Sequence, residues 1–216
     1  SLDSMVANYT ALKKFRKSDD YTPGGKNNKR PDRATIVYTN LIKQHFKNTA
    51  PIVLGGIEAS LRRIAHYDFW DNRIRRSVLF DAKADYLLYG NADRSIVDLA
   101  RSLKHQRPPQ NIRGLCYISS KPQYNYINLP SYQEVTDNDD KFIEMFDIFY
   151  KNCDPVNAHG LYQKMDTRYL VQNPPAHYLS NEELDRIYEY DFEHQQHPYY
   201  RKMGKVRALD TISNTI

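Results

Sequence analysis

The feature that most constrains the fold is a short apolar run that ends in glycine and precedes a helix-like pattern, because it occurs twice. Residues 51–54 read Pro-Ile-Val-Leu, and the run ends at Gly55 and Gly56. An unbroken apolar run of this length is typical of a strand buried on both faces. Residues 85–89 end at Gly90 in the same way. Strand, glycine turn and helix in succession predict an α/β fold with a parallel sheet and flanking helices.

Helical periodicity accompanies these strands. Apolar side chains recur every three or four residues from about 32 to 47, and a further helix is expected to start near Glu58. Residues 93–103 form another such pattern, with an inward face expected to hold Ile96, Val97, Leu99, Ala100 and Leu103. A third strand is expected over 112–118. Residues 73–84 fit either a helix or a strand.

The pattern changes beyond residue 120. Residues 124–129 are expected to form one strand of a small hairpin, and 167–171 another strand. A helix over 137–150 would place Phe142, Met145, Phe146 and Phe149 on one face. Ser180 and Glu183 have the spacing of a capping box, which predicts a helix from 181 to about 190.

Three segments follow from these patterns. Residues 1–30 are polar and rich in turn formers, and we expect an exposed connecting segment. Residues 31–120 are expected to form an α/β domain with a parallel sheet. Residues 121–216 are expected to form a mixed α+β extension.

Composition excludes several classes of protein. The 216 residues include two cysteines, Cys116 and Cys153, which cannot by themselves supply a four-ligand zinc site or a three-cysteine iron–sulfur motif. No apolar run is long enough to span a bilayer, so no membrane partner is expected. The first residues lack the pattern of an export signal, and we expect a cytoplasmic protein with free thiols.

The candidate ligand edge lies where the two apolar strands end. In parallel α/β sheets, ligands usually bind beyond the carboxyl ends of the strands. The candidate residues are Gly55, Gly56, Glu58, Arg62, Arg63, His66, Gly90, Asp93 and Arg94. The glycines would let a ligand approach the backbone, and the cationic side chains could meet a phosphate or carboxylate.

Each part of this edge also has a purely structural interpretation. Around Gly55, the arginines would pair with Asp68, Asp71 and Glu58 on an exposed face. Around Gly90, Asp93 or Asn91 would cap the following helix. A double glycine lacks the full dinucleotide-binding fingerprint.

Other patterns predict less. His194 and His197 have no third ligand nearby, and no arrangement supports a hydrolase triad. Cys116 lies in an expected core strand, where a thiol is inert. The net charge of +5, the basic stretches 73–76 and 205–207, and the stretch 199–202, which combines tyrosines with basic residues, leave RNA or polyanion binding open. A contact surface between domains is the alternative interpretation.

Long strings of this sequence resemble the YgiQ family of radical S-adenosylmethionine (SAM) proteins. They are RPDRATIVYTN at 30–40, PIVLGGIEASLRRIAHYDFW at 51–70, ADYLLYGNADRSIVDLA at 84–100, LVQNPP at 170–175 and FEHQQHPYY at 192–200. The resemblance extends over nearly the whole chain. It implies an amino-terminal, cobalamin-domain-like α/β region followed by a radical SAM barrel of the same parent chain. Residues 31–120 would then form a partial Rossmann-like domain that is incomplete at its start, because the family region has further strands before it.

The resemblance also implies which cofactors belong to the parent protein. The family binds a [4Fe-4S] cluster through a C-x-x-x-C-x-x-C motif, which is absent here and is expected beyond Ile216. No residue of this sequence is therefore assigned to the cluster or to SAM. A cobalamin-binding D-x-H-x-x-G loop is not found, and residues 154–160 have the wrong spacing. The resemblance assigns no substrate, and we expect the region to be inactive by itself.

Overall fold

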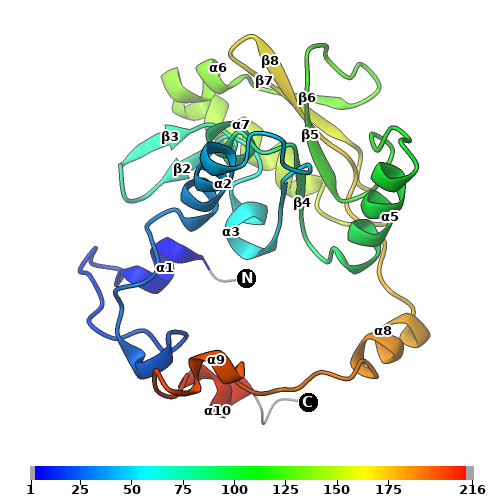
Figure 1. The fold of residues 1–216 in the computed structure, drawn as a ribbon. Helices are drawn as coiled ribbons and strands as arrows, with labels where there is room; N and C mark the ends of the chain where they lie inside the picture. The colour runs from blue at the N-terminus through cyan, green and yellow to red at the C-terminus, as the bar shows by residue number, and fades with distance from the viewer. Residues whose placement is uncertain (1–2, 213–216) are drawn as a thin grey trace. The chain divides into compact units, whose positions relative to one another are not determined.

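A computed structural model describes residues 3–212, which divide into two compact units (Figure 1). Residues 35–178 form one unit, which we call the sheet unit. Residues 3–34 and 179–212 form the other, which we call the terminal unit. The fold class is α/β, as expected. No helix within 3–212 has the length and apolar character needed to cross a membrane.

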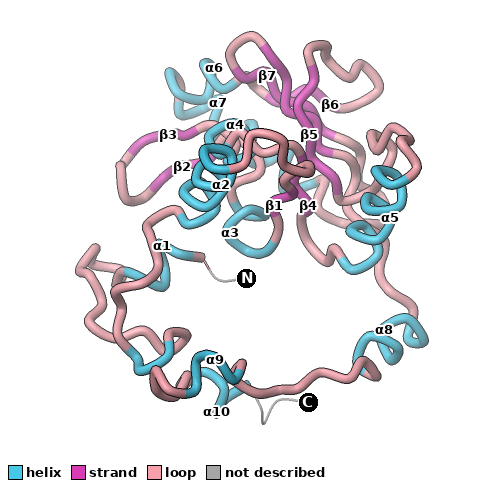
Figure 2. Tube along the Cα trace, viewed as in Figure 1, coloured by secondary structure: helices cyan, strands magenta, loops and turns pink. Residues whose placement is uncertain are grey.

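The sheet unit is built on a six-stranded mixed sheet in the order β1-β4-β5-β8-β7-β6 (Figure 2). Its strands are β1 (Val53–Leu54), β4 (Tyr86–Leu88), β5 (Leu115–Ser119), β6 (Ile127–Leu129), β7 (Leu161–Met165) and β8 (Arg168–Gln172). The outer pairs β1·β4 and β6·β7 are parallel. The three central pairs are antiparallel. A two-stranded antiparallel ribbon, β2 (His66–Asp68) and β3 (Arg73–Arg75), is separate from this sheet.

Two strand directions differ from the sequence prediction. The parallel arrangement is confirmed for β1 and β4 but is wrong for β5, because the chain after β4 returns to the edge where β4 ended. There the Tyr89 amide donates to the Gly114 carbonyl over 3.0 Å. The hairpin expected at 124–129 is also wrong. β6 instead pairs in parallel with β7, since the helices α6 (Tyr132–Asp137) and α7 (Asp139–Lys151) connect them.

Helices cover both faces of the sheet. One face packs against α3 (Gly56–Leu61), α4 (Val78–Ala82), α6, α7 and the start of α2 (Ala34–His45). The other face packs against α5 (Asp93–Lys104). Neighbouring residues of one strand alternate between the two cores, as the pleat requires: Leu87 faces the first core and Leu88 the second.

Helices α5 and α7 each bury a narrower face than their apolar patterns predict. On α5, Ser95 and Leu99 are buried one turn apart, whereas Ile96, Val97 and Ala100 are exposed, so the expected inward positions of those three are wrong. On α7, Met145 is buried but Phe146 is exposed. A helix on the outside of a sheet buries only the stripe that points at it.

Polar contacts order the amino-terminal part of the terminal unit, which contains α1 (Ser4–Asn8) and a short 3-10 helix (Pro23–Gly25). Asp19 is buried and accepts hydrogen bonds from Thr22 and Arg30. The buried Asn27 donates to the Arg16 carbonyl over 2.9 Å. The first thirty residues are therefore more than an exposed connection, because buried side chains without apolar periodicity hold them in place.

The carboxyl-terminal part of this unit contains α8 (Asn181–Tyr188), α9 (Pro198–Arg201) and α10 (Ala208–Ile212). The capping box of Ser180 and Glu183 is confirmed at the start of α8. The 3-10 turn lies against the segment after α9, since the Gly24 amide donates to the Lys205 carbonyl over 3.2 Å. A Cβ on Gly204, whose φ is +103°, would lie 2.8 Å from the Gly24 Cα.

Candidate functional site

The two glycine turns lie at one edge of the sheet, because β1 and β4 are parallel neighbours. Gly56 follows β1 with a φ of +80°, and Gly90 follows β4 with a φ of +67°. Both values are in the region that favours glycine. The Gly90 amide donates to Ser60 Oγ over 3.3 Å, which links the second turn to α3. The predicted meeting of the two turns is thus present in the structure.

Glu58 faces inward from this edge. Its buried carboxylate accepts hydrogen bonds from the amide and the hydroxyl of Thr35, at the start of α2. Arg62 Nη1 donates back to the Glu58 carbonyl over 3.4 Å. Glu58 therefore anchors α2 to α3 and has a structural role within the edge.

Arg63 has an unusual environment for a cation. Its guanidinium carbon lies 4.4 Å from the ring centroids of both Tyr89 and Phe149. Nε donates to Gln172 Oε1 over 2.9 Å, and Nη1 donates to the Ser60 carbonyl. Among the described residues, no carboxylate pairs with Arg63, so the ion pairs expected for it in the structural interpretation are wrong. Aromatic faces and amide oxygens hold this charge instead.

His66 lies on β2, close to this edge in sequence but in a different setting. Burial lowers the pKa of its imidazole to about 4, with the nearby Arg62 charge acting in the same direction. Its Nδ1 is 3.1 Å from the Ile64 carbonyl. At neutral pH the ring is uncharged, so it cannot serve as a cation for a phosphate or carboxylate.

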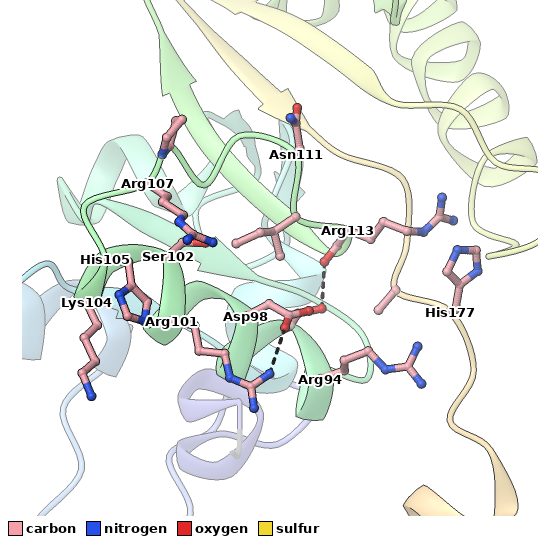
Figure 3. A pocket seen from close by; sticks show the side chains of 14 residues that line it. Arg94, Asp98, Arg101, Ser102, Lys104, His105, Arg107, Asn111, Arg113 and His177 are labelled. Carbon is pink, nitrogen blue, oxygen red and sulfur yellow. Dashed lines mark hydrogen bonds and ion pairs between the residues drawn. The ribbon is translucent and has the colours of Figure 1, made fainter.

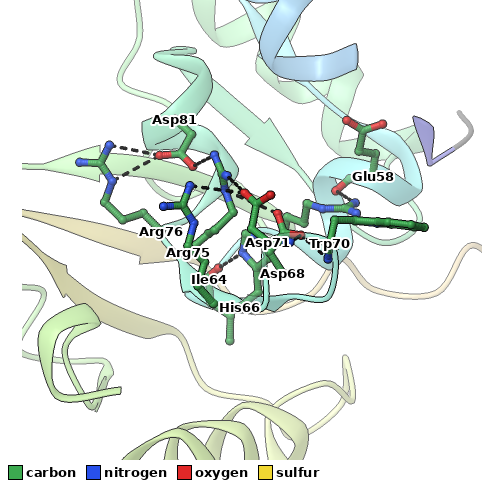
Figure 4. A network of polar contacts seen from close by, with 11 residues as sticks. Glu58, Ile64, His66, Asp68, Trp70, Asp71, Arg75, Arg76 and Asp81 are labelled. Atoms are coloured by element: carbon green, nitrogen blue, oxygen red, sulfur yellow. Dashed lines mark hydrogen bonds and ion pairs between the residues drawn. The ribbon is translucent and has the colours of Figure 1, made fainter. Parts of the chain in front are cut away.

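A cluster of acidic and basic side chains surrounds the β2–β3 ribbon (Figure 4). Arg75 contacts Asp71 at 2.8 Å, Asp81 at 3.3 Å and Asp68 at 3.7 Å. Arg76 joins Asp81 at 3.1 Å. Two arginines of the basic stretch 73–76 are thus already paired with carboxylates, which reduces the charge that this stretch offers to a polyanion.

The segment after Gly90 leads away from the glycine edge into α5. Ala92 is the N-cap residue and no side chain caps the helix, so the expected cap by Asp93 or Asn91 is wrong. Asp93 lies exposed in the first turn. Arg94 lies in the wall of a groove of about 830 Å³ between α5 and the loop that follows it (Figure 3). None of the other candidate residues lines this groove.

The groove, which we call the α5 groove, is strongly cationic. Its lining includes five basic side chains and one carboxylate: Arg94, Arg101, Lys104, Arg107, Arg113 and Asp98. Our sequence interpretation missed it, because Arg107, Arg113 and His177 reach it from loops with no periodicity. The one available signal was the spacing of Arg94, Arg101 and Lys104 along the polar face of α5.

A buried asparagine holds the loop that lies beside the α5 groove. Asn173 Nδ2 donates to the carbonyls of Gln110 and Ile112 at 2.7 and 2.6 Å, and Oδ1 accepts from the Tyr126 hydroxyl at 3.0 Å. Arg113 Nε donates to the Pro175 carbonyl over 2.8 Å. The loop 105–113 is thereby held against the segment 173–177.

Comparison with known proteins places this arrangement in a family. The family model described as "Radical SAM N-terminal" matches residues 1–215. The chain belongs to the Radical SAM N-terminal family. A UPF0313 protein of Fusobacterium nucleatum is 56% identical over 216 residues, and one of Thermotoga maritima is 52% identical over 219. A UPF0313 protein of Clostridium botulinum is 45% identical over 221 residues.

These relatives are much longer than this chain. The alignments cover all of this Radical SAM N-terminal chain. The chain spans only 38% of the length of the first two relatives and 34% of the third. No solved structure matches it.

The family implies a [4Fe-4S] cluster and SAM for the parent protein, and the residues of this Radical SAM N-terminal domain do not fit such a cluster. Cluster iron is bound by several cysteine thiolates. Cys116 is buried in β5, and burial raises the pKa of its thiol to about 12. Cys153 is exposed, and the sequence has no third cysteine to join it. Within 3–212, no three His, Cys, Asp or Glu side chains are grouped as metal ligands.

Proposed function

We propose that this chain is the accessory amino-terminal region of a radical SAM enzyme whose cluster and SAM are bound by the remainder of the parent chain. The supporting observation is the family match over residues 1–215 in a chain that spans 38% of its relatives. The described residues offer no cluster ligands. According to this proposal, the region is cytoplasmic and is not catalytic by itself. Its partner is the radical SAM barrel of the same parent chain. The substrate class is left open.

Within this function, the glycine edge from Gly55 to Tyr67 faces the barrel and helps to close it over a substrate. Ile57 and Leu61, one turn apart on α3, are 57% and 66% exposed. Adjacent exposed apolar side chains are typical of a surface that another domain covers. The remainder of the parent chain is the occupant that this proposal assigns to them.

Arg63 is the cation of this edge that would bind an anionic group of the substrate. The two aromatic rings and Gln172 fix the guanidinium before any ligand arrives, and no carboxylate of the described residues neutralises it. A fixed guanidinium pairs well with a planar carboxylate or a phosphate. Closure over the barrel would exclude water and strengthen such a contact.

Anaerobic reconstitution of the full-length parent protein with iron and sulfide tests the enzyme proposal. The expected product is a brown protein that cleaves SAM to 5′-deoxyadenosine when reduced. Replacing the first cysteine of the expected C-x-x-x-C-x-x-C motif by alanine is the control and should abolish both properties. A colourless parent protein with an intact motif would contradict the proposal.

Thiol labelling tests the position of the edge. In full-length protein carrying Cys153→Ser, the thiol introduced by Ile57→Cys should react with a maleimide at least about tenfold more slowly than the one introduced by Tyr124→Cys. Tyr124 is 84% exposed and lies far from α3 in sequence, so it reports unhindered labelling. Equal labelling rates at the two positions would show that the barrel does not cover α3.

A further inference from the structure

We infer that the α5 groove is a binding site for a single-stranded nucleic acid, held through its phosphodiester backbone. The inference rests on groove residues alone and does not depend on radical SAM chemistry. None of the candidate residues except Arg94 takes part in it.

Five cations in the lining of the groove face one carboxylate. Asp98, its one carboxylate, lies 3.8 Å from Arg101. The side chains of Lys104 and Arg107 are exposed and have no hydrogen-bond or ion-pair partner among the described residues. Cations held close together without partners repel one another, so a bound anion would stabilise them.

Arginine geometry favours phosphate as the bound group. Four of the five cations are arginines, whose planar guanidinium pairs with phosphate through two hydrogen bonds. Arg113 is already oriented, because Nε and Nη2 donate to the carbonyls of Pro175 and Pro155 at 2.8 and 2.7 Å. Ser102 and Asn111 add neutral donors to the same lining.

The extent of the groove favours several phosphates in a row. Arg94 and Lys104 are ten residues apart on one helix, which corresponds to about 15 Å along its axis. Four of the lining cations are arginines, so a strand with one phosphate at each guanidinium would make about four phosphate contacts. A volume of about 830 Å³ suits a few nucleotides of one strand.

The lining also indicates which part of the strand the groove would bind. Its apolar members are Pro108, Ile112 and Ala176, and no Phe, Tyr or Trp ring lines it. The bases of a bound single strand stack on aromatic side chains where a groove offers them, and this lining offers none of these three rings. The groove therefore holds the backbone and leaves the bases outside, which makes binding tolerant of sequence.

Binding of a fluorescent 12-residue oligouridylate to the full-length parent protein tests this site. The dissociation constant is measured between 50 and 300 mM salt, with and without reconstitution of the cluster. About four phosphate contacts predict a slope of about −2.8 for log affinity against log salt. In the variant Lys104→Ala/Arg107→Ala, this slope should change by about 1.4, from about −2.8 to about −1.4. That change corresponds to about 25-fold weaker binding at 0.1 M salt.

A matched double variant controls for overall charge. Lys47→Ala/Lys121→Ala removes two exposed lysines that do not line the groove, and its affinity should stay within about twofold of the wild type. Unchanged thermal midpoints of both variants would show that they remain folded.

Four results would overturn the inference: no binding of the oligouridylate, wild-type affinity in the groove variant, an equal loss in the control variant, or displacement by inorganic triphosphate at the same concentration as by the 12-mer. The last result would show a site for a compact anion. SAM cleavage, followed in the same samples, separates this outcome from failure of the proposed function.

Discussion

Arg63 and Gln172 are joined by a 2.9 Å hydrogen bond from Nε to Oε1, although 109 residues separate them in the chain. The bond connects the segment after α3 to the end of β8. Gln172 is buried, and its Nε2 has no hydrogen-bond partner among the described residues. The cation between Tyr89 and Phe149 therefore depends on an amide that is itself fixed in the sheet.

Replacing this cation should destabilise the sheet unit. Arg63→Ala removes two cation–π contacts and leaves the buried Gln172 oxygen without its donor, so the free energy of unfolding should fall by about 3 kcal/mol. Arg63→Lys keeps the charge but loses the planar fork, and it should lose less. Urea unfolding of the chain measures both, with Lys121→Ala as an exposed control. A change below about 0.5 kcal/mol in Arg63→Ala would contradict the assigned role.

His66 should make stability depend on pH. Its pKa is lowered to about 4 in the folded chain, against 6.5 for an ordinary histidine, so the unfolded chain binds the proton more readily. Its contribution to the free energy of unfolding is complete above pH 6.5 and is lost as the pH falls toward 4. The total loss should be about 3 kcal/mol. Urea midpoints between pH 4 and 7.5 measure this loss. His66→Gln should show a shallower decline over the same range, and identical profiles for the two proteins would refute the assignment.

Gly204→Ala should loosen the terminal unit. The new Cβ would lie 2.8 Å from the Gly24 Cα and 3.0 Å from its nitrogen, and the backbone has a φ of +103°. Strain and overlap together should cost about 2 kcal/mol or more. Limited proteolysis should cut within 179–212 faster than in the wild type. Gly90→Ala is the matched control, because its φ is also positive but its Cβ would meet nothing within 4 Å.

The two thiols should differ in reactivity. Cys153 is exposed, whereas Cys116 is buried with a pKa raised to about 12. Because the thiolate is the reactive form, iodoacetamide at pH 8 should modify Cys153 and leave Cys116 intact until the chain unfolds. Mass spectrometry of peptides from native and guanidinium-treated protein measures this. Rapid modification of Cys116 in native protein would show that β5 is not a buried central strand.

Local patterns predicted the elements of this fold better than their pairing. The helix starting after Ser180 was predicted from two side chains three residues apart, because a capping box is complete within one turn. The direction of β5 could not be predicted in this way. It depends on the loop 105–114, which returns the chain so that Gly114 lies beside Tyr89.

In the candidate site, too, local features were predicted from the sequence and long-range packing was not. The meeting of Gly56 and Gly90 at one edge was predicted, because parallel neighbours end on the same side. The environment of Arg63 was not, since Phe149 and Gln172 come from α7 and β8. The α5 groove was missed because its cations come from one helix face and from one loop without periodicity.

The sequence by itself determined the α/β class, the glycine turns and the family, since each of these depends on short strings or local periodicity. Only the tertiary structure decided that Glu58 is an anchor, that the environment of His66 lowers its pKa and that Arg63 lies between two rings without a carboxylate partner among the described residues. The physical reason is that charge and burial depend on which distant segments pack together. A sequence pattern fixes which side chains are available, and the packing of the sheet fixes what each one meets.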